Sequence, residues 1–171
     1  MAKAGPRGVL LGFLAIRKTP SEGVRGGYLI TTEYGRPVEF HYTTELKLAG
    51  PQRLLFGGAA PEYLHVELVA VPLTDKQSVA PQILFVDSPA LLELRTRIPA
   101  PVVCVSPPSI VGGDGRHLAP VAVRCHPEHP GDAAIFERLR ELAPSQFDWL
   151  EPFDRLTGAL AEIRETRSLA A

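Results

Sequence analysis

The chain has 171 residues, 45% of them hydrophobic, and a formal net charge of −1 at pH 7. This length suits one domain, and the hydrophobic share is enough to build a core without disulfides or a metal. A net charge so close to zero excludes a global basic field that would draw nucleic acid or an anionic membrane surface to the protein.

The charges are nevertheless unevenly distributed along the chain. Residues 1–60 carry eight Lys and Arg against four Asp and Glu, a net charge of +4, and residues 61–171 carry ten against fifteen, a net charge of −5. Two explanations fit this difference. Charged residues on solvated surfaces can be distributed unevenly by chance, or the asymmetry of charge can serve the function of the protein.

The cysteine content and the N-terminus predict a cytoplasmic protein. Cys104 and Cys125 are the only cysteines, too few for the disulfide framework of a small secreted chain. The apolar run 8–16 ends in Arg17 and Lys18 without a small-residue cleavage site, so it is typical of a strand and not of a signal peptide. No stretch approaches the roughly 18 consecutive apolar residues that cross a bilayer, so no membrane contact is expected.

Three strands are predicted in the first 50 residues, over residues 8–18, 27–33 and 38–46. Short polar or glycine-containing segments separate them, so they are expected to form an antiparallel meander. The third strand alternates between apolar and polar residues, with Glu39 and His41 on its polar face. This polar face is a candidate recognition surface.

The middle of the chain predicts a βαβ unit. Apolar runs at 83–86 and 102–105 are typical of strands buried on both faces, and a helical pattern lies between them at 90–98. These strands are therefore expected to be parallel, with a right-handed crossover. The apolar residues of 62–71 have helical spacing, but several of them are β-branched valines, which favour strands. The sequence therefore predicts either a helix or a strand for this segment. Residues 112–116 are glycine-rich with no helix after them, which predicts a surface loop.

The last third of the chain predicts an edge strand at 121–125 and two helices. Asp132 is expected to cap the first helix, at 133–142. Asp148, with a glutamate three positions later, resembles a capping box that opens a helix reaching about residue 166.

Together these elements predict a single α/β domain with a mixed sheet. It consists of an antiparallel meander (1–50), an αβαβ section (51–128) and two C-terminal helices (129–171). Three hairpin-connected strands followed by alternating helices and strands resemble the element order of the ribonuclease H-like fold. The resemblance is one of topology.

Nucleases of the ribonuclease H-like fold use carboxylates to hold two Mg²⁺ ions about 4 Å apart. The resemblance implies that Asp87, at the end of the fourth strand, is one ligand and that Glu62 or Glu67 on the first helix is another, with Glu67 taken as the assisting residue. A later helix would add Asp132 or Glu137. The first strand, within residues 8–18, contains no acid, so the site lacks its central ligand. Asp87 also precedes Ser-Pro at the start of a helix, a pattern typical of a helix cap.

A second candidate is a zinc site built from Cys104, Cys125, His126 and His129. Thiolate and imidazole are the ligands that Zn²⁺ prefers, and four of them complete a tetrahedral site. No C-x₂-C pair anchors such a site, and core cysteines with surface histidines fit the same pattern. Burial in an apolar strand is also expected to make Cys104 inert as a nucleophile. No cofactor is therefore expected, with Zn²⁺ or Mg²⁺ as the metals to consider.

The last helix carries the clearest interaction signal. Its apolar residues recur at spacings of four and three and form one stripe: Trp149, Phe153, Leu156, Leu160 and Ile163. Such a stripe packs either on the chain's own sheet or on a partner. A protein partner or a second copy of the chain is therefore expected at this helix.

These observations favour a non-catalytic binding or assembly subunit of a larger complex. It would make protein–protein contacts through the meander's polar face, with Glu39 and His41, and through the stripe of the last helix. The alternative is a metal-dependent nuclease or phosphotransferase centred on Asp87. An enzyme is the less favoured class because no complete catalytic set is present, the first strand having no acid. Nucleic acid is a possible partner that the net charge does not support.

Overall fold

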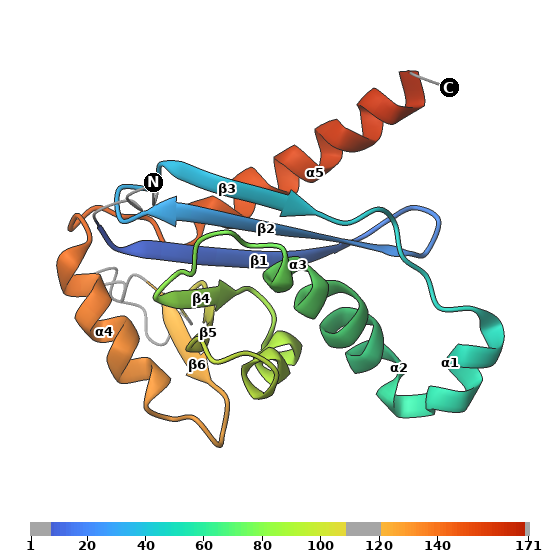
Figure 1. Cartoon of the computed structure of the whole chain (residues 1–171), viewed down its shortest axis with the longest axis horizontal. Coiled ribbons are helices and arrows are strands. Elements are labelled where there is room, and N and C mark those ends of the chain that lie inside the picture. The colour runs from blue at the N-terminus through green and yellow to red at the C-terminus, as the bar shows by residue number, and fades with distance from the viewer. Residues whose placement is uncertain (1–7, 109–120, 170–171) are drawn as a thin grey trace, which may run out of the picture.

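The computed structural model of the chain describes residues 8–108 and 121–169, with side chains up to residue 163. The glycine-rich segment 112–116 lies outside this part. Six strands of the described residues form one sheet, and Figure 1 shows helices on both of its faces. The strands are β1 (Leu10–Lys18), β2 (Val24–Thr32), β3 (Pro37–Tyr42), β4 (Ile83–Val86), β5 (Val102–Ser106) and β6 (Ala122–Cys125).

The sheet is mixed and has the strand order β3-β2-β1-β4-β5-β6. β2 is antiparallel to both β1 and β3, β4 is parallel to both β1 and β5, and β6 is antiparallel to β5. This confirms the predicted fold class, with its meander, its parallel βαβ pair and its edge strand. The topology is consistent with the ribonuclease H-like order.

Strand β4 is buried on both faces, as its continuous apolar run predicts. Ile83, Leu84, Phe85 and Val86 are each at most 1% exposed. Leu84 and Val86 pack on one face of the sheet, and Ile83 and Phe85 pack on the other. This alternation, continued by one residue, points Asp87 to the same face as Phe85.

A helical rod between β3 and β4 covers one face of the sheet. It consists of α1 (Gly50–Phe56), a 3₁₀ turn (Gly57–Ala59), α2 (Ala60–Glu62), a π-helical segment (Tyr63–Ala70) and α3 (Val71–Asp75). Residues 62–71 are therefore helical, which decides between the two structures that the sequence left open. Their valines face the sheet, and Val69 lies so close to β2 that a Cβ at Gly26 would meet it at 2.3 Å. Only glycine fits there without movement of the rod.

By length and composition alone, the rod, which has 26 residues from Gly50 to Asp75, also qualifies as a membrane-spanning helix, because a window of 18 residues within it has a mean hydropathy of 1.2. The rod is still not a run of about 18 consecutive apolar residues, because Glu62 and Glu67 interrupt it. A core helix passes the same test, and Val66, Val69 and Leu73 of the rod are at most 1% exposed against the sheet. The crossover from β4 to β5 lies on this face too, as a 3₁₀ helix (Pro89–Thr96).

Two helices, α4 (Asp132–Leu142) and α5 (Glu151–Leu169), cover the opposite face (Figure 1). The apolar stripe that leads into α5 packs on this face. Four of its members are at most 4% exposed, namely Trp149, Phe153, Leu156 and Leu160, and Ile163 is half-buried. The stripe expected to bind a partner is thus part of the chain's own core.

The two predicted helix caps have different outcomes. The Asp148 carboxylate does bind backbone at the start of α5, since its Oδ1 accepts hydrogen bonds from the N–H groups of Leu150 at 2.9 Å and Glu151 at 3.3 Å. The Glu151 side chain, however, pairs with Arg155 in the structure and does not complete the predicted capping box. The prediction that Asp132 caps α4 is wrong. Gly131 holds the N-cap position, and the Asp132 carboxylate is buried, with 5% of its side chain exposed.

Candidate functional site

Asp87 lies where the ends of β1 and β4 meet α5. Its Oδ2 pairs with Nη2 of Arg17, the second-last residue of β1, at 2.6 Å. Arg17 in turn donates a hydrogen bond from Nε to Oγ1 of Thr157 on α5, at 2.9 Å. The Asp87 side chain keeps 23% of its surface exposed, so the carboxylate is oriented by an arginine and still reached by solvent.

Asp87 does not act as the helix cap that its Asp-Ser-Pro setting suggests. The N-cap position of the 3₁₀ helix belongs to Ser88, and no side chain caps it. The Asp87 carboxylate points instead toward the face of the sheet that α5 covers, where Arg17 is within reach. An ion pair to a neighbouring strand has replaced the local hydrogen bond.

The described residues do not fit a centre of two Mg²⁺ ions. The position beside Asp87 on β1, one residue past the Leu14–Val86 pair, is the fully buried Ala15. Glu67 lies on the rod at the opposite face and pairs with Arg97 at 2.9 Å. Among the residues that the structure describes, no three His, Cys, Asp or Glu side chains are close enough to hold one metal ion.

The four candidate zinc ligands are not brought to one point. Cys104 packs in the core on the side of the rod, whereas Cys125 packs on the side of α4 and α5. His126 uses both ring nitrogens in the chain: Nδ1 accepts from the N–H of Glu128 at 3.2 Å, and Nε2 lies 3.3 Å from Oε1 of Glu93. Burial raises the pKa of Cys104 to about 11, with the Asp87 charge adding to it, so this thiol is not a nucleophile at neutral pH.

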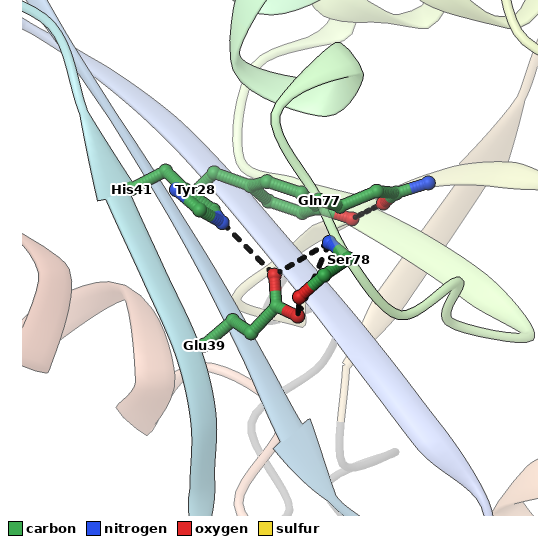
Figure 2. Close-up of polar contacts among 5 residues, drawn as sticks. All are labelled: Tyr28, Glu39, His41, Gln77 and Ser78. Carbon is green, nitrogen blue, oxygen red and sulfur yellow. Dashed lines mark hydrogen bonds and ion pairs between the residues drawn. The ribbon is translucent and has the colours of Figure 1, made fainter. Parts of the chain in front are cut away.

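Glu39 and His41 belong to a network that ties the edge strand β3 to the segment before β4 (Figure 2). Oε2 of Glu39 lies 2.9 Å from Nε2 of His41 and accepts from the N–H of Ser78 at 3.0 Å, and the Ser78 hydroxyl also donates to Glu39. Beside them, the Tyr28 hydroxyl donates to Gln77 at 2.7 Å. Burial, with the Glu39 charge, raises the pKa of Tyr28. The polar face of the meander is therefore occupied by contacts within the chain.

Replacing Glu39 with glutamine is expected to destabilise the protein at pH 7 and to remove part of its acid sensitivity. Partial burial works to raise the pKa of Glu39, but hydrogen bonds from Ser78 and His41 outweigh it and lower the pKa below its ordinary value of 4.5. A lowered pKa stabilises the folded state above the unfolded pKa, and this contribution is lost as the pH falls through the folded pKa. Urea unfolding of wild type and E39Q should thus differ at pH 7, and the difference should disappear as the pH falls through the folded-state pKa of Glu39, which lies below 4.5. The same difference at pH 7 and below that pKa would contradict this role.

A group of cations at the end of the β1–β2 hairpin was missed by sequence reasoning. We call it the cationic end; its members are Arg17, Lys18, Arg25, Lys47 and Arg53. The strand register places Arg17 directly opposite Arg25. The signal was available, because a hairpin that closes between residues 18 and 24 pairs these two positions, but the second strand was predicted to begin only at residue 27.

Two cavities open at the cationic end. The larger, of about 570 Å³, lies between the end of β1 and the rod, and three of its lining residues are Lys18, Lys47 and Arg53. Burial, together with the charge of Lys18, lowers the pKa of His65 in its wall. The smaller, of about 270 Å³, lies on the α5 side and is lined in part by Arg17, Lys18 and Arg25. Of the two, the smaller cavity is the one beside Asp87, because Arg17 lines it and pairs with Asp87.

No protein-family model matches the chain, and no relative was found among curated proteins. Several solved structures are similar in fold. Human endonuclease V is 17% identical with a TM-score of 0.45, and the match covers 64% of this chain and 49% of that protein. Endonuclease V of Ciona intestinalis, in complex with DNA containing an inosine, is 16% identical with a TM-score of 0.41 and coverages of 81% and 58%. An Argonaute of Marinitoga piezophila with a guide RNA is 12% identical, with a TM-score of 0.34 and coverages of 61% and 17%.

These comparisons correct the expectation of a non-catalytic assembly subunit. The similar structures are endonucleases and an Argonaute bound to nucleic acid, not assembly subunits. The two surfaces on which that expectation relied are also accounted for within the chain: the α5 stripe is core, and the polar face of the meander is tied to Ser78. The chain spans about half to three-fifths of the length of the endonucleases that it resembles.

Proposed function

We propose that the chain is a nuclease or phosphotransferase that acts on nucleic acid at the junction of β1, β4 and α5, with Asp87 as its acidic group. The observation that supports it best is the state of the Asp87 carboxylate. Arg17 holds Oδ2, whereas Oδ1 makes no hydrogen bond within the described part of the chain and solvent reaches the side chain. An oriented carboxylate with one available oxygen is suited to accept a proton.

The surroundings of Asp87 suit a phosphodiester substrate. Asp87 would take the proton of a water or hydroxyl group that attacks phosphorus, while the opposite P–O bond breaks and the leaving oxygen is protonated from solvent. The guanidinium of Arg17 would stabilise the negative charge that grows on the phosphate oxygens. The other members of the cationic end would hold the neighbouring phosphates of the strand.

The net charge of the chain is close to zero, but a local cluster of positive charge is enough to bind nucleic acid. The cationic end lies within residues 1–60, which carry a net charge of +4 in a chain of net charge −1. Local clusters of lysine and arginine make the phosphate contacts of a protein, and charges farther away than about 8 Å are largely screened at physiological salt. The acidic remainder of the chain is compatible with such contacts.

Replacing Asp87 with asparagine is expected to lower cleavage at least about 100-fold, because the variant keeps the shape of the side chain but loses the proton acceptor. We would measure cleavage of end-labelled single- and double-stranded DNA and RNA. The panel would include DNA containing inosine, the nucleic acid of the Ciona intestinalis complexes. Each substrate would be assayed with Mg²⁺, with Mn²⁺ and with a chelator.

The matched control is Asp75→Asn, which makes the same change at an exposed residue at the end of α3. D75N should cleave as wild type does. Absence of cleavage by the wild-type chain on the whole panel, or equal cleavage by wild type and D87N, would refute the proposal.

A further inference from the structure

Arg25 is a buried guanidinium without a counter-ion. The residue is 8% exposed, and its one hydrogen bond in the described part of the chain runs from Nη1 to the backbone oxygen of Leu160, at 3.2 Å. Its Nε is buried and has no partner among the described residues. No described carboxylate forms an ion pair with Arg25. Buried charges in proteins are ordinarily paired, because an unpaired one is costly to desolvate.

The strand register adds a second cost at the same place. Arg17 and Arg25 are directly opposed on β1 and β2, and like charges in that position destabilise a sheet. Asp87 neutralises Arg17 at 2.6 Å. Lys18, next along β1, forms no ion pair with any residue that the structure describes. Three positive groups therefore share one carboxylate, and the local excess of positive charge remains at Arg25 and Lys18.

A cavity of about 270 Å³ lies beside these groups, between the end of the β1–β2 hairpin and α5. Its lining residues are Arg17, Lys18, Thr19, Arg25, Thr157, Leu160 and Ala161. No acidic residue is among them, and the threonines and the backbone add polar groups to the charged ones. The volume is several times the roughly 30 Å³ that one water molecule occupies in the liquid, so a phosphate group fits.

We propose that this cavity is an oxyanion site that binds a phosphate group through Arg25 and Lys18. The bound oxygens would accept hydrogen bonds from Nη2 of Arg25, which has no partner in the described part of the chain and is not among its buried unpartnered atoms, and from the ammonium of Lys18. Arginine and lysine both bind phosphate in this charge-assisted way. Phosphate binding would supply the missing counter-ion and relieve the repulsion between Arg17 and Arg25. Identification of this phosphate as part of a nucleic-acid substrate rests on the proposed function, whereas the oxyanion site itself does not.

The test compares thermal unfolding in inorganic phosphate and in chloride at equal ionic strength and pH. Phosphate should raise the unfolding temperature of the wild type. In Arg25→Met, which replaces the charge by an apolar side chain of similar length, the unfolding temperature in chloride should be at least that of the wild type, and the rise caused by phosphate should disappear. Lys18→Gln, at an exposed residue, should reduce the rise, and Lys76→Gln, an exposed lysine outside the cavity, should leave it unchanged.

The source of the phosphate is decided by a binding assay with a fluorescently labelled single-stranded oligonucleotide. If the phosphate belongs to a nucleic acid, R25M should bind the oligonucleotide at least tenfold more weakly than wild type, and inorganic phosphate should compete. If the oligonucleotide binds both proteins equally while inorganic phosphate still stabilises only the wild type, the site takes a free phosphate or a phosphomonoester.

The proposal is overturned if phosphate does not stabilise the wild type more than chloride does, or if it stabilises wild type and R25M equally. If R25M does not fold, the K18Q variant provides the test. A rise in its unfolding temperature with phosphate as large as that of the wild type would overturn the proposed oxyanion site. The D87N variant separates this test from that of the proposed function. Because D87N removes the counter-ion of Arg17, it should bind phosphate and the oligonucleotide at least as tightly as the wild type even though it does not cleave. A failure of cleavage therefore does not affect the test of the oxyanion site.

Discussion

Replacing Phe85 with alanine is expected to lower the free energy of unfolding by about 4 kcal/mol, because the substitution removes a fully buried ring and leaves a cavity. Phe85 is 0% exposed on the central strand β4. Its ring centroid lies 5.1 Å from that of Phe13, 5.5 Å from Phe136 and 5.3 Å from Trp149. One side chain thus joins the sheet to α4 and to the segment that enters α5. Urea unfolding followed by circular dichroism measures the loss.

The matched control for this prediction is Phe56→Ala. Phe56 lies at the end of α1, is 40% exposed, and has a single ring contact, with Tyr63 at 4.0 Å. Loss of an exposed aromatic pair is expected to cost no more than about 1.5 kcal/mol. If F85A and F56A lost the same stability, the aromatic cluster on this face would not be the centre of the core.

Replacing Asp132 with alanine is expected to cost about 3–5 kcal/mol, because it leaves a largely buried arginine without its partner. Oδ2 of Asp132 accepts from Nε of Arg95 at 2.8 Å and from the backbone N–H of Val102 at 3.1 Å. The first of these contacts ties α4 to the crossover helix, and the second ties it to the start of β5. The carboxylate that the sequence assigns to a helix cap is thus a link between three elements.

Two further variants identify the cause of that loss. Asp132→Asn keeps an oxygen for the N–H of Val102 and gives up the ion pair, so it should lose less stability than D132A. Glu137→Ala removes an ion pair to Arg140 on the exposed face of the same helix, where the two groups are 3.6 Å apart and 56% and 42% exposed. Such pairs contribute about 0–1 kcal/mol. A loss for E137A equal to that for D132A would show that the buried link is not the cause.

Much of the fold could be predicted from local patterns. The apolar run of β4 at 83–86 indicates correctly that this strand is buried on both faces. The alternation in β3 misleads, because its apolar residues Val38, Phe40 and Tyr42 are 37–39% exposed. Its polar residues Glu39 and His41 instead face the segment before β4. The order of hairpins and crossover fixes strand directions, since parallel neighbours need a crossover connection. Residues 62–71 were ambiguous because their valines pack on the sheet as part of a π-helical segment, and a helix with its β-branched residues turned to a sheet gives a mixed signal.

The candidate site was only half predictable. The position of Asp87 at the end of β4 follows from the sequence, but its partner does not. Arg17 faces Asp87 because β1 and β4 are parallel in a register that pairs Leu14 with Val86. The register between two strands that are distant in sequence cannot be predicted from the residues of either strand alone. The same holds for Arg25, whose burial depends on α5 lying over the hairpin.

Local composition also misled in two places. Cys104 and Cys125 lie on neighbouring strands, yet the register pairs Cys125 with Val103, so the two thiols point to opposite faces. The stripe of α5 has the spacing of an interface helix, but a helix that docks on its own sheet has the same spacing. Only the packing in the folded chain distinguishes these cases.

The most direct test of the central claim is the single-turnover rate of phosphodiester cleavage by D87N relative to D75N, on the substrate of the panel that the wild type cleaves fastest. We expect D75N to retain the wild-type rate and D87N to fall at least about 100-fold below it, although D87N should bind the substrate at least as tightly because Arg17 loses its counter-ion. Equal rates for the two variants would contradict the assignment of Asp87 as the acidic group of this site.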